Sequence, residues 1–494
     1  MSEIGNQTTS IPVADAHNHG TAHHLHEKEV AGYHQDLKHR HIQMIALGGA
    51  LGTGLFLGAG GRLHAGGPGL ALVYAVCGLI GYLMLRSLGE MVVYRPTSGS
   101  FTSYSREFLG EKAAFFAGWI YFIAWVTVGI AELTAIALYL RFWPVFQSVP
   151  QWVLVAFALC VVVGVNLFGV KLFGEAEFWF AFIKVAAIVV FMIIAVVVII
   201  LGDPIDGHVP GLSTLTEGGG WFPNGVMPLI VMTQGVVFAY AGIDMIGVTA
   251  GEMANPREEI PRAINTTVWR IIFFYVGSVF LLALVLPASA YSGDESPFVT
   301  FLNALGVPGA ADIMNVVVLT AALSSVNAGL YATCRILKPL AVNGSAPQFL
   351  GRMSAQGVPT GGVWLTTGCF VLGVVLNYIV PGHAFEIVLN LGAIGILAMW
   401  AMICLSHLGY LHAANKGRLT RHDYRAPGGA VSDIIVLAFL CGVLVLMTLD
   451  YPNGTYTTIT AVCAFVPLFV GGWLLSKRSR ARAASMLSDD AAAS

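Results

Sequence analysis

Long apolar stretches dominate the chain and alternate with short polar ones. A helix needs about 20 apolar residues to cross a bilayer, and twelve segments approach or exceed that length. They lie near 42–62, 69–89, 113–140, 152–170, 177–201, 228–250, 268–287, 312–336, 361–380, 384–408, 431–449 and 455–475. The pattern predicts an all-α integral membrane protein with twelve transmembrane helices.

Composition supports this class. Hydrophobic residues make up 56% of the 494 residues and charged residues 11%, whereas soluble domains carry roughly 25% charged residues. The net charge of −2 gives no indication of a nucleic acid partner. All seven cysteines fall in or at the ends of apolar segments, so we expect neither disulfides nor a metal site. The polar first 40 residues contain no apolar stretch typical of a cleavable signal peptide.

The basic residues of the loops predict the orientation in the membrane. If the N-terminus is inside, nearly all loop Lys and Arg fall on the inner side, and the outer loops carry only Arg62 and Arg141. We therefore expect a multi-pass protein of the cytoplasmic membrane, with residues 1–41 and 476–494 as cytoplasmic tails. The first tail holds eight of the fourteen histidines and is either a disordered tail or a metal-binding one.

Two of the predicted spans are interrupted by glycine. The first contains Gly48, Gly49, Gly52 and Gly54 within seven residues, and the sixth, 228–250, contains Gly242 and Gly247 beside Asp244. A helix broken inside a membrane exposes N–H groups at the start of its second half, and these groups bind anions such as carboxylates. The alternative is a face of small residues that packs against another helix.

The spacing of the two interruptions predicts an internal repeat. They fall five spans apart, as expected if spans 1–5 (42–201) and spans 6–10 (228–408) form a 5+5 inverted repeat, with spans 11 and 12 (431–475) following. In such an arrangement the substrate site lies between the discontinuous spans 1 and 6.

Three ionisable residues lie deep within predicted spans: Glu132, Lys184 and Asp244. A charge at the bilayer centre costs at least about 2.5–3.5 kcal/mol, so each needs a partner, a wet cavity or a neutral state. They form either buried structural pairs or a proton-coupling site, in which a desolvated lysine cycles between charged and neutral forms.

Other polar groups near the membrane allow simpler interpretations. We expect Glu177 at the cytoplasmic interface, and Arg86 and Glu90, four residues apart, to pair or to reach toward water. In the eighth span, Ser324, Ser325 and Asn327 either line a polar pathway or bond to neighbouring helices.

Several motifs resemble those of bacterial amino acid permeases of the amino acid–polyamine–organocation superfamily. They are GALGTGLF at 49–56, LGEM at 88–91, PTSGSF at 96–101, EFWFAFIKV at 177–185 and AGEMANP at 250–256. The resemblance covers about residues 38–476, and within the superfamily the chain is most similar to members that transport L-asparagine. It implies a leucine-transporter-like fold and import by proton symport, with no cofactor beyond the coupling proton.

The resemblance also implies roles for particular residues. It places the substrate carboxylate at the backbone of Gly52, Thr53 and Gly54, and the substrate amine at carbonyls around Ala241 and Gly242. Phe238 is the expected gate, and Lys184 matches a lysine that occupies a cation position in proton-coupled relatives. Asp244 stands where related sequences commonly have Glu, which leaves the reach of its carboxylate open.

Three function classes remain distinguishable. The first is a transporter, with asparagine as its expected substrate and aspartate or a broader set of neutral amino acids as alternatives. The second is an amino acid sensor that moves little substrate, which the lack of a large soluble domain disfavours. The third, an enzyme, is disfavoured because no nucleophile–base pair or metal motif is visible in the sequence.

Overall fold

The computed structural model describes residues 51–485 except 98, 168–169, 217–218, 251–252, 254, 355–356 and 484. The predicted tail 1–41, the first residues of the first predicted span and the tail residues 486–494 lie outside this part. Regular structure in the described residues is helical, and the β-pairing found there is a single bridge between Ile205 and His208. The all-α prediction is confirmed for this part of the chain.

Helices overlap all twelve predicted segments. Their bounds are α3 Thr53–Phe56, α4 Gly58–Gly66, α5 Leu70–Tyr94, α7 Glu111–Leu140, α9 Gln151–Leu167, α10 Val170–Leu201, α11 Val226–Ala239, α12 Met245–Thr249, α13 Pro256–Arg270, α14 Ser278–Val285, α16 Ala310–Val342, α17 Thr360–Ile379, α18 Ala384–Asn415, α19 Ala430–Leu449 and α20 Asn453–Leu475. A π-helical stretch, Ile271–Gly277, joins α13 to α14.

Many of these helices are long enough for a membrane. Nine helical stretches of the described residues have the length and apolar character needed to cross a bilayer, and α9 and α11 are apolar but shorter. The first stretch, Thr53–Tyr94, runs through α3, α4 and α5. The chain is therefore a multi-pass membrane protein.

Three shorter helices lie outside the predicted segments. They are α6 Ser100–Leu109, α8 Pro144–Gln147 and α15 Pro297–Ala304. The α6 sequence, SFTSYSREFL, mixes polar and apolar residues, so a search for apolar stretches passes over it. Such helices are recognised by an amphipathic pattern rather than by overall apolarity.

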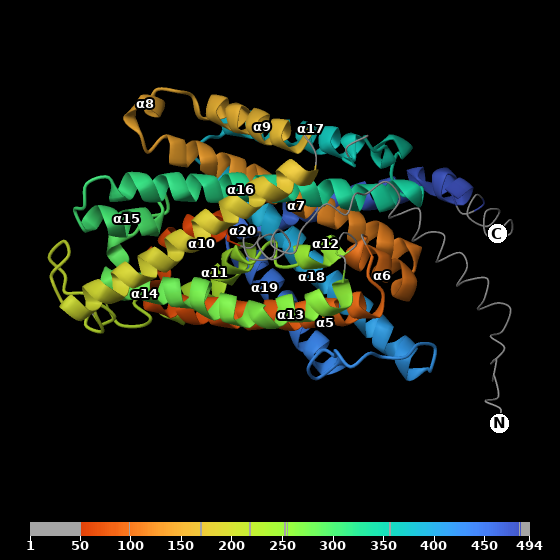
Figure 1. Cartoon of the computed structure of the whole chain (residues 1–494), viewed down its shortest axis with the longest axis horizontal. Coiled ribbons are helices and arrows are strands. Elements are labelled where there is room, and N and C mark those ends of the chain that lie inside the picture. Colours follow the sequence, from red (N-terminus) through yellow and green to blue (C-terminus); the bar gives the residue numbers. More distant parts are fainter. Residues whose placement is uncertain are drawn as a thin grey trace, which may run out of the picture.

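The helix α7 lies at the centre of the bundle. It packs against α16 and α18, and Figure 1 shows these helices running along the long axis of the molecule. The most apolar part of α7 is 83% buried, whereas that of α20 is 11% buried. Large apolar side chains such as Trp179, Ile193 and Leu468 remain exposed on outer helices, as expected of surfaces that face lipid.

The prediction that Arg86 pairs with Glu90 is wrong. Arg86 donates to the Asn265 side chain and to the Arg425 carbonyl, while Glu90 accepts from Arg421 Nε at 2.8 Å. Four residues along a helix bring two side chains close, but contacts from other parts of the chain offer each of them a better partner. Glu90 is fully buried, so its charge requires these contacts.

Glu90 belongs to a set of charged groups that we term the buried ion cluster: Glu90, His407, Arg421 and Asp433. His407 lies between the two carboxylates, with Nε2 3.2 Å from Glu90 Oε2 and Nδ1 2.6 Å from Asp433 Oδ2. Each ring nitrogen of His407 thus lies within hydrogen-bond distance of a carboxyl oxygen. The cluster joins α5, α18, α19 and the loop that precedes α19.

Candidate functional site

The predicted interruption of the sixth span is present in the described residues, whereas the first span is described only from Leu51 onward. Gly52 has extended backbone before α3 begins at Thr53, and residues 240–244 separate α11 from α12. Gly242, within the second interruption, has a φ of +95°, a conformation that favours glycine. The sixth predicted span is therefore discontinuous, and the described part of the first is non-helical up to Gly52.

The two interrupted helices touch each other through their backbones. A Cβ atom added to Gly54 would lie 2.5 Å from Ala239 Cα, much closer than real side chains approach. Gly54 is on α3 and Ala239 ends α11, so the contact joins the halves that flank the two breaks. The glycine is required here because no larger residue fits between the chains.

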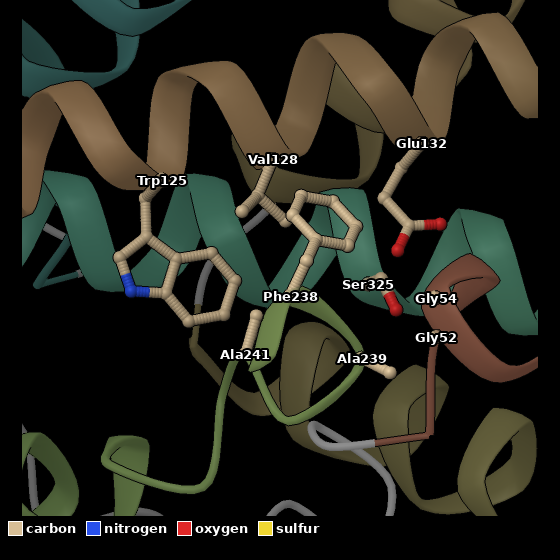
Figure 2. Close-up of a pocket in the computed structure, with 9 residues that line it drawn as sticks. All are labelled: Gly52, Gly54, Trp125, Val128, Glu132, Phe238, Ala239, Ala241 and Ser325. Carbon is tan, nitrogen blue, oxygen red and sulfur yellow. The ribbon is translucent and has the colours of Figure 1, made fainter. Parts of the chain in front are cut away.

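A small, partly open pocket lies beside this contact, and its empty space of about 260 Å³ includes open solvent. Figure 2 shows its nine lining residues, which come from α3 and the residue before it, α7, the end of α11, the break that follows α11, and α16. They are Gly52, Gly54, Trp125, Val128, Glu132, Phe238, Ala239, Ala241 and Ser325. The pocket therefore forms where the broken helices meet two continuous ones.

The side chain of Glu132 reaches the start of α3. The backbone N–H of Thr53 donates to Glu132 Oε1 at 3.1 Å. Glu132 is buried, with 2% of its surface exposed. A Cβ at Gly52 would lie 2.6 Å from Glu132 Oε1 and 2.8 Å from Ser325 Oγ. A free N–H at a helix start attracts an anion, and here the anion is a carboxylate of the protein itself.

Phe238 forms an aromatic wall of the pocket. Its ring lies between Val128 and Glu132 in Figure 2 and is 2% exposed. Gly392 on α18 leaves room for the ring, because a Cβ there would lie 2.9 Å from Phe238 Cε2. The ring is thus enclosed by α7 and α18, and its movement would change access to the pocket.

Asp244 lies beyond the pocket, at the residue that precedes α12. It is 1% exposed, and neither carboxylate oxygen accepts a well-formed hydrogen bond from the described residues. The backbone of Gly242 and the side chain of Tyr121 on α7 interact with this carboxyl group. Thr53 and Gly242 also stand next to the pocket without lining it.

Lys184 contacts α16 at Ser324, the residue before the pocket-lining Ser325. Its Nζ donates to Ser324 Oγ at 2.9 Å, and the lysine is fully buried. Ser325, the next residue, lines the pocket, so one turn of α16 carries both a lining residue and the partner of Lys184. Asn327 accepts a hydrogen bond from Asn166 Nδ2 at 2.6 Å and therefore bonds to a neighbouring helix.

Some of these residues were not predicted from the sequence. Trp125 and Val128 line the pocket from α7, but apolar residues in a long apolar helix carry no distinguishing signal. The prediction that Glu177 lies at the interface is wrong, because it is fully buried and accepts a hydrogen bond from Ser324 at 2.6 Å. The helix α10 begins at Val170 rather than at 177, so Glu177 lies two turns inside it.

Comparison with known proteins identifies relatives along nearly the whole chain. The family model described as amino acid permease matches residues 41–486. The chain is 53% identical to the L-asparagine permease of Streptomyces coelicolor over 448 residues, which is 91% of each chain. It is 53% identical to the L-asparagine permease of Escherichia coli strain K12 over 442 residues, 90% of this chain and 88% of the relative.

A third relative is similar to the chain over a comparable length. The chain is 52% identical to L-asparagine permease 1 of Mycobacterium tuberculosis strain H37Rv over 459 residues, 93% of this chain and 94% of the relative. The matched region includes both interrupted helices, all nine lining residues of the pocket and Lys184. The chain therefore belongs to the amino acid permease family.

Proposed function

We propose that this chain imports L-asparagine across the cytoplasmic membrane by proton symport and alternating access. The observation that carries the substrate assignment is the 51–53% identity to L-asparagine permeases over about nine-tenths of the chain. The pocket between the interrupted helices supports a site for a small amino acid, because broken helices supply backbone groups for a carboxylate and an amine.

The proposed architecture is twelve spans in a leucine-transporter-like 5+5 inverted repeat with both termini inside. Two findings support it: helices overlap every predicted segment, and the sixth is interrupted between α11 and α12. The basic residues of the loops support the orientation. Alternating access then follows from movement of the helices around a fixed site.

Glu132 is proposed to link proton and substrate binding. Its carboxylate accepts from the Thr53 N–H, the group to which we assign the substrate carboxylate. Two anions cannot share one donor without repulsion, so the substrate would bind once Glu132 is neutralised by a proton or turns away. Lys184 is proposed to carry the coupling proton, which is supported by its burial and its bond to Ser324 beside the pocket.

The lining residues favour asparagine over aspartate. Their charged member is Glu132, and none of the nine is Lys or Arg. A second carboxylate on the substrate would therefore meet no cationic partner among these residues, whereas a neutral amide needs none. Aspartate remains the second candidate because its shape nearly equals that of asparagine.

The test is uptake of radiolabelled asparagine by cells that lack their own asparagine transport. We expect uptake above an empty-vector control, strong inhibition by excess unlabelled asparagine, weak inhibition by aspartate at neutral pH, and loss of accumulation when a protonophore collapses the gradient. Equal inhibition by aspartate would contradict the asparagine assignment. Absence of uptake from cells with correctly inserted protein would favour the sensor.

A further inference from the structure

A chain of three buried polar groups extends from Lys184 away from the pocket. Lys184 Nζ donates to Ser324 Oγ at 2.9 Å, and Ser324 Oγ donates to Glu177 Oε1 at 2.6 Å. Lys184, Ser324 and Glu177 are each fully buried. The serine hydroxyl thus accepts from the cation and donates to the carboxylate, which is the order of bonds that a proton relay requires.

The position of Glu177 gives this series of hydrogen bonds a direction. Glu177 precedes Lys184 by seven residues on α10, which is about 10 Å along the helix axis. The first residues of α10 face the cytoplasm in the proposed orientation. Glu177 therefore stands between Lys184 and the side to which an imported proton must leave.

We propose that Glu177 accepts the proton of Lys184 through the hydroxyl of Ser324 and passes it toward the cytoplasm. An N–H bond of the Lys184 ammonium breaks as Ser324 Oγ takes that proton, and the original Ser324 O–H bond breaks as its proton joins Glu177. The products are a neutral amine, an unchanged serine and a neutral carboxylic acid. This inference rests on the proposed function, in which Lys184 carries the coupling proton.

The surroundings of Glu177 suit this role. Its second oxygen, Oε2, is buried and accepts no well-formed hydrogen bond from the described residues, which leaves a place for a proton. Asn327 lies beside it and is held by Asn166 of α9. The other charged group that acts on Lys184 is Glu132 of α7. Transfer replaces two buried charges by two neutral groups, which removes their desolvation cost.

Transfer also loosens the contact between the two helices. A charged Lys184 on α10 bonds strongly to Ser324 on α16, because hydrogen bonds from an ionised donor are about twice as strong as neutral ones. The neutral amine holds Ser324 less firmly. Release of the proton to Glu177 would therefore weaken the link between α10 and α16 as the inner side opens.

The test compares wild-type protein with Glu177→Gln in proteoliposomes. Glutamine keeps an acceptor for the Ser324 hydroxyl but takes up no proton at Oε2. We measure accumulation of labelled asparagine under an imposed pH gradient, proton entry with a trapped pH-sensitive dye, and asparagine counterflow without a gradient. We expect the variant to keep counterflow and to lose both accumulation and proton entry.

A matched control separates the loss of a proton acceptor from the loss of any carboxylate on α10. Glu175→Gln changes a half-buried glutamate two residues earlier on the same helix and should accumulate asparagine as the wild type does. Glu177→Asp restores a carboxyl group and should recover part of the pH-driven accumulation. Failure of that recovery would count against a proton-carrying role.

The outcomes distinguish this inference from the proposed function. If the wild type shows no pH-driven accumulation, proton symport itself is wrong. If the wild type accumulates asparagine and Glu177→Gln does so equally well, the relay is wrong and symport stands. If Glu177→Gln loses counterflow together with accumulation, Glu177 holds the structure together and the relay is likewise overturned.

Discussion

At the scale of single residues, the close contact of Gly54 with Ala239 sets the shape of the pocket. We predict that Gly54→Leu abolishes asparagine uptake, because its side chain would collide with the Ala239 backbone, 2.5 Å from a Cβ at this position. Overpacking of this kind costs about 1–3 kcal/mol even where neighbours can shift, and each 1.4 kcal/mol corresponds to tenfold in affinity. Binding and uptake assays on membrane-inserted protein measure the effect.

The control for Gly54→Leu is Gly442→Leu. Gly442 lies on α19, and a Cβ there meets no atom within 4 Å among the described residues. This variant adds the same side chain to a membrane helix and should transport normally. Wild-type uptake by correctly inserted Gly54→Leu would contradict the prediction, because it would show that the two helices can separate without loss of transport.

The role of Lys184 leads to a second prediction at this scale. Lys184→Ala should insert and exchange asparagine across the membrane, but it should lose accumulation driven by a pH gradient, because it removes the group proposed to carry the proton. Lys112→Ala, which changes an exposed lysine at the start of α7, serves as the control. Full pH-driven accumulation by Lys184→Ala would move the coupling site to Glu132 or Asp244.

The residues of the site differ in how well the sequence predicts them. Gly52, Gly54, Glu132 and Ser325 line the pocket and could be singled out from the sequence, since glycine and polar groups are conspicuous in an apolar span. Trp125 lines it as well, yet nothing in its neighbourhood marks it out. The roles assigned to these residues stay predictions, because a substrate pose depends on contacts that a sequence pattern does not contain.

At the scale of helices, the buried ion cluster joins α5, α18 and α19 at one end of the bundle. Glu90 accepts hydrogen bonds from Arg421 and from the Ala426 N–H, and it faces His407. We predict that Glu90→Gln destabilises the protein by about 3–5 kcal/mol, because it removes the fully buried charge to which Arg421, whose side chain is 25% exposed, and the buried His407 are bound. Thermal unfolding in detergent measures the loss.

A surface ion pair provides the comparison for Glu90. Glu107 bonds to Arg95 at 2.6 Å, and both side chains are 29% exposed. Glu107→Gln should cost about 1 kcal/mol or less, since water screens such pairs. Similar unfolding temperatures for Glu90→Gln and Glu107→Gln would contradict the view that burial makes the ion cluster important.

The helices can be predicted from the sequence more closely than the contacts that their side chains make. In lipid, every backbone polar group of a span needs a hydrogen-bond partner within the protein, so long apolar segments form helices. The partners of Glu90 are separated from it by more than 300 residues, and an i,i+4 pattern says nothing of such contacts. The pairing of Arg86 with Glu90 was wrong for this reason.

At the scale of the whole molecule, the order of long helices and the interruption of the sixth span could be predicted because apolar length and glycine density are local signals. The amphipathic helices α6 and α15 could not, because their sequences are too short and too mixed for an apolarity search. The inverted repeat stays a prediction. It relates distant halves of the chain and rests on the spacing of two interruptions.

The backbone contact between Gly54 and Ala239 has a mechanical consequence. No layer of side chains separates α3 from the end of α11 at this point. The two backbones pack directly against each other, which opposes sliding of one helix past the other. We therefore expect the two to shift together during transport and to carry Gly52, Phe238 and Ala241 with them. The walls supplied by α7 and α16 belong to other, continuous helices, so the pocket changes width where this pair meets them.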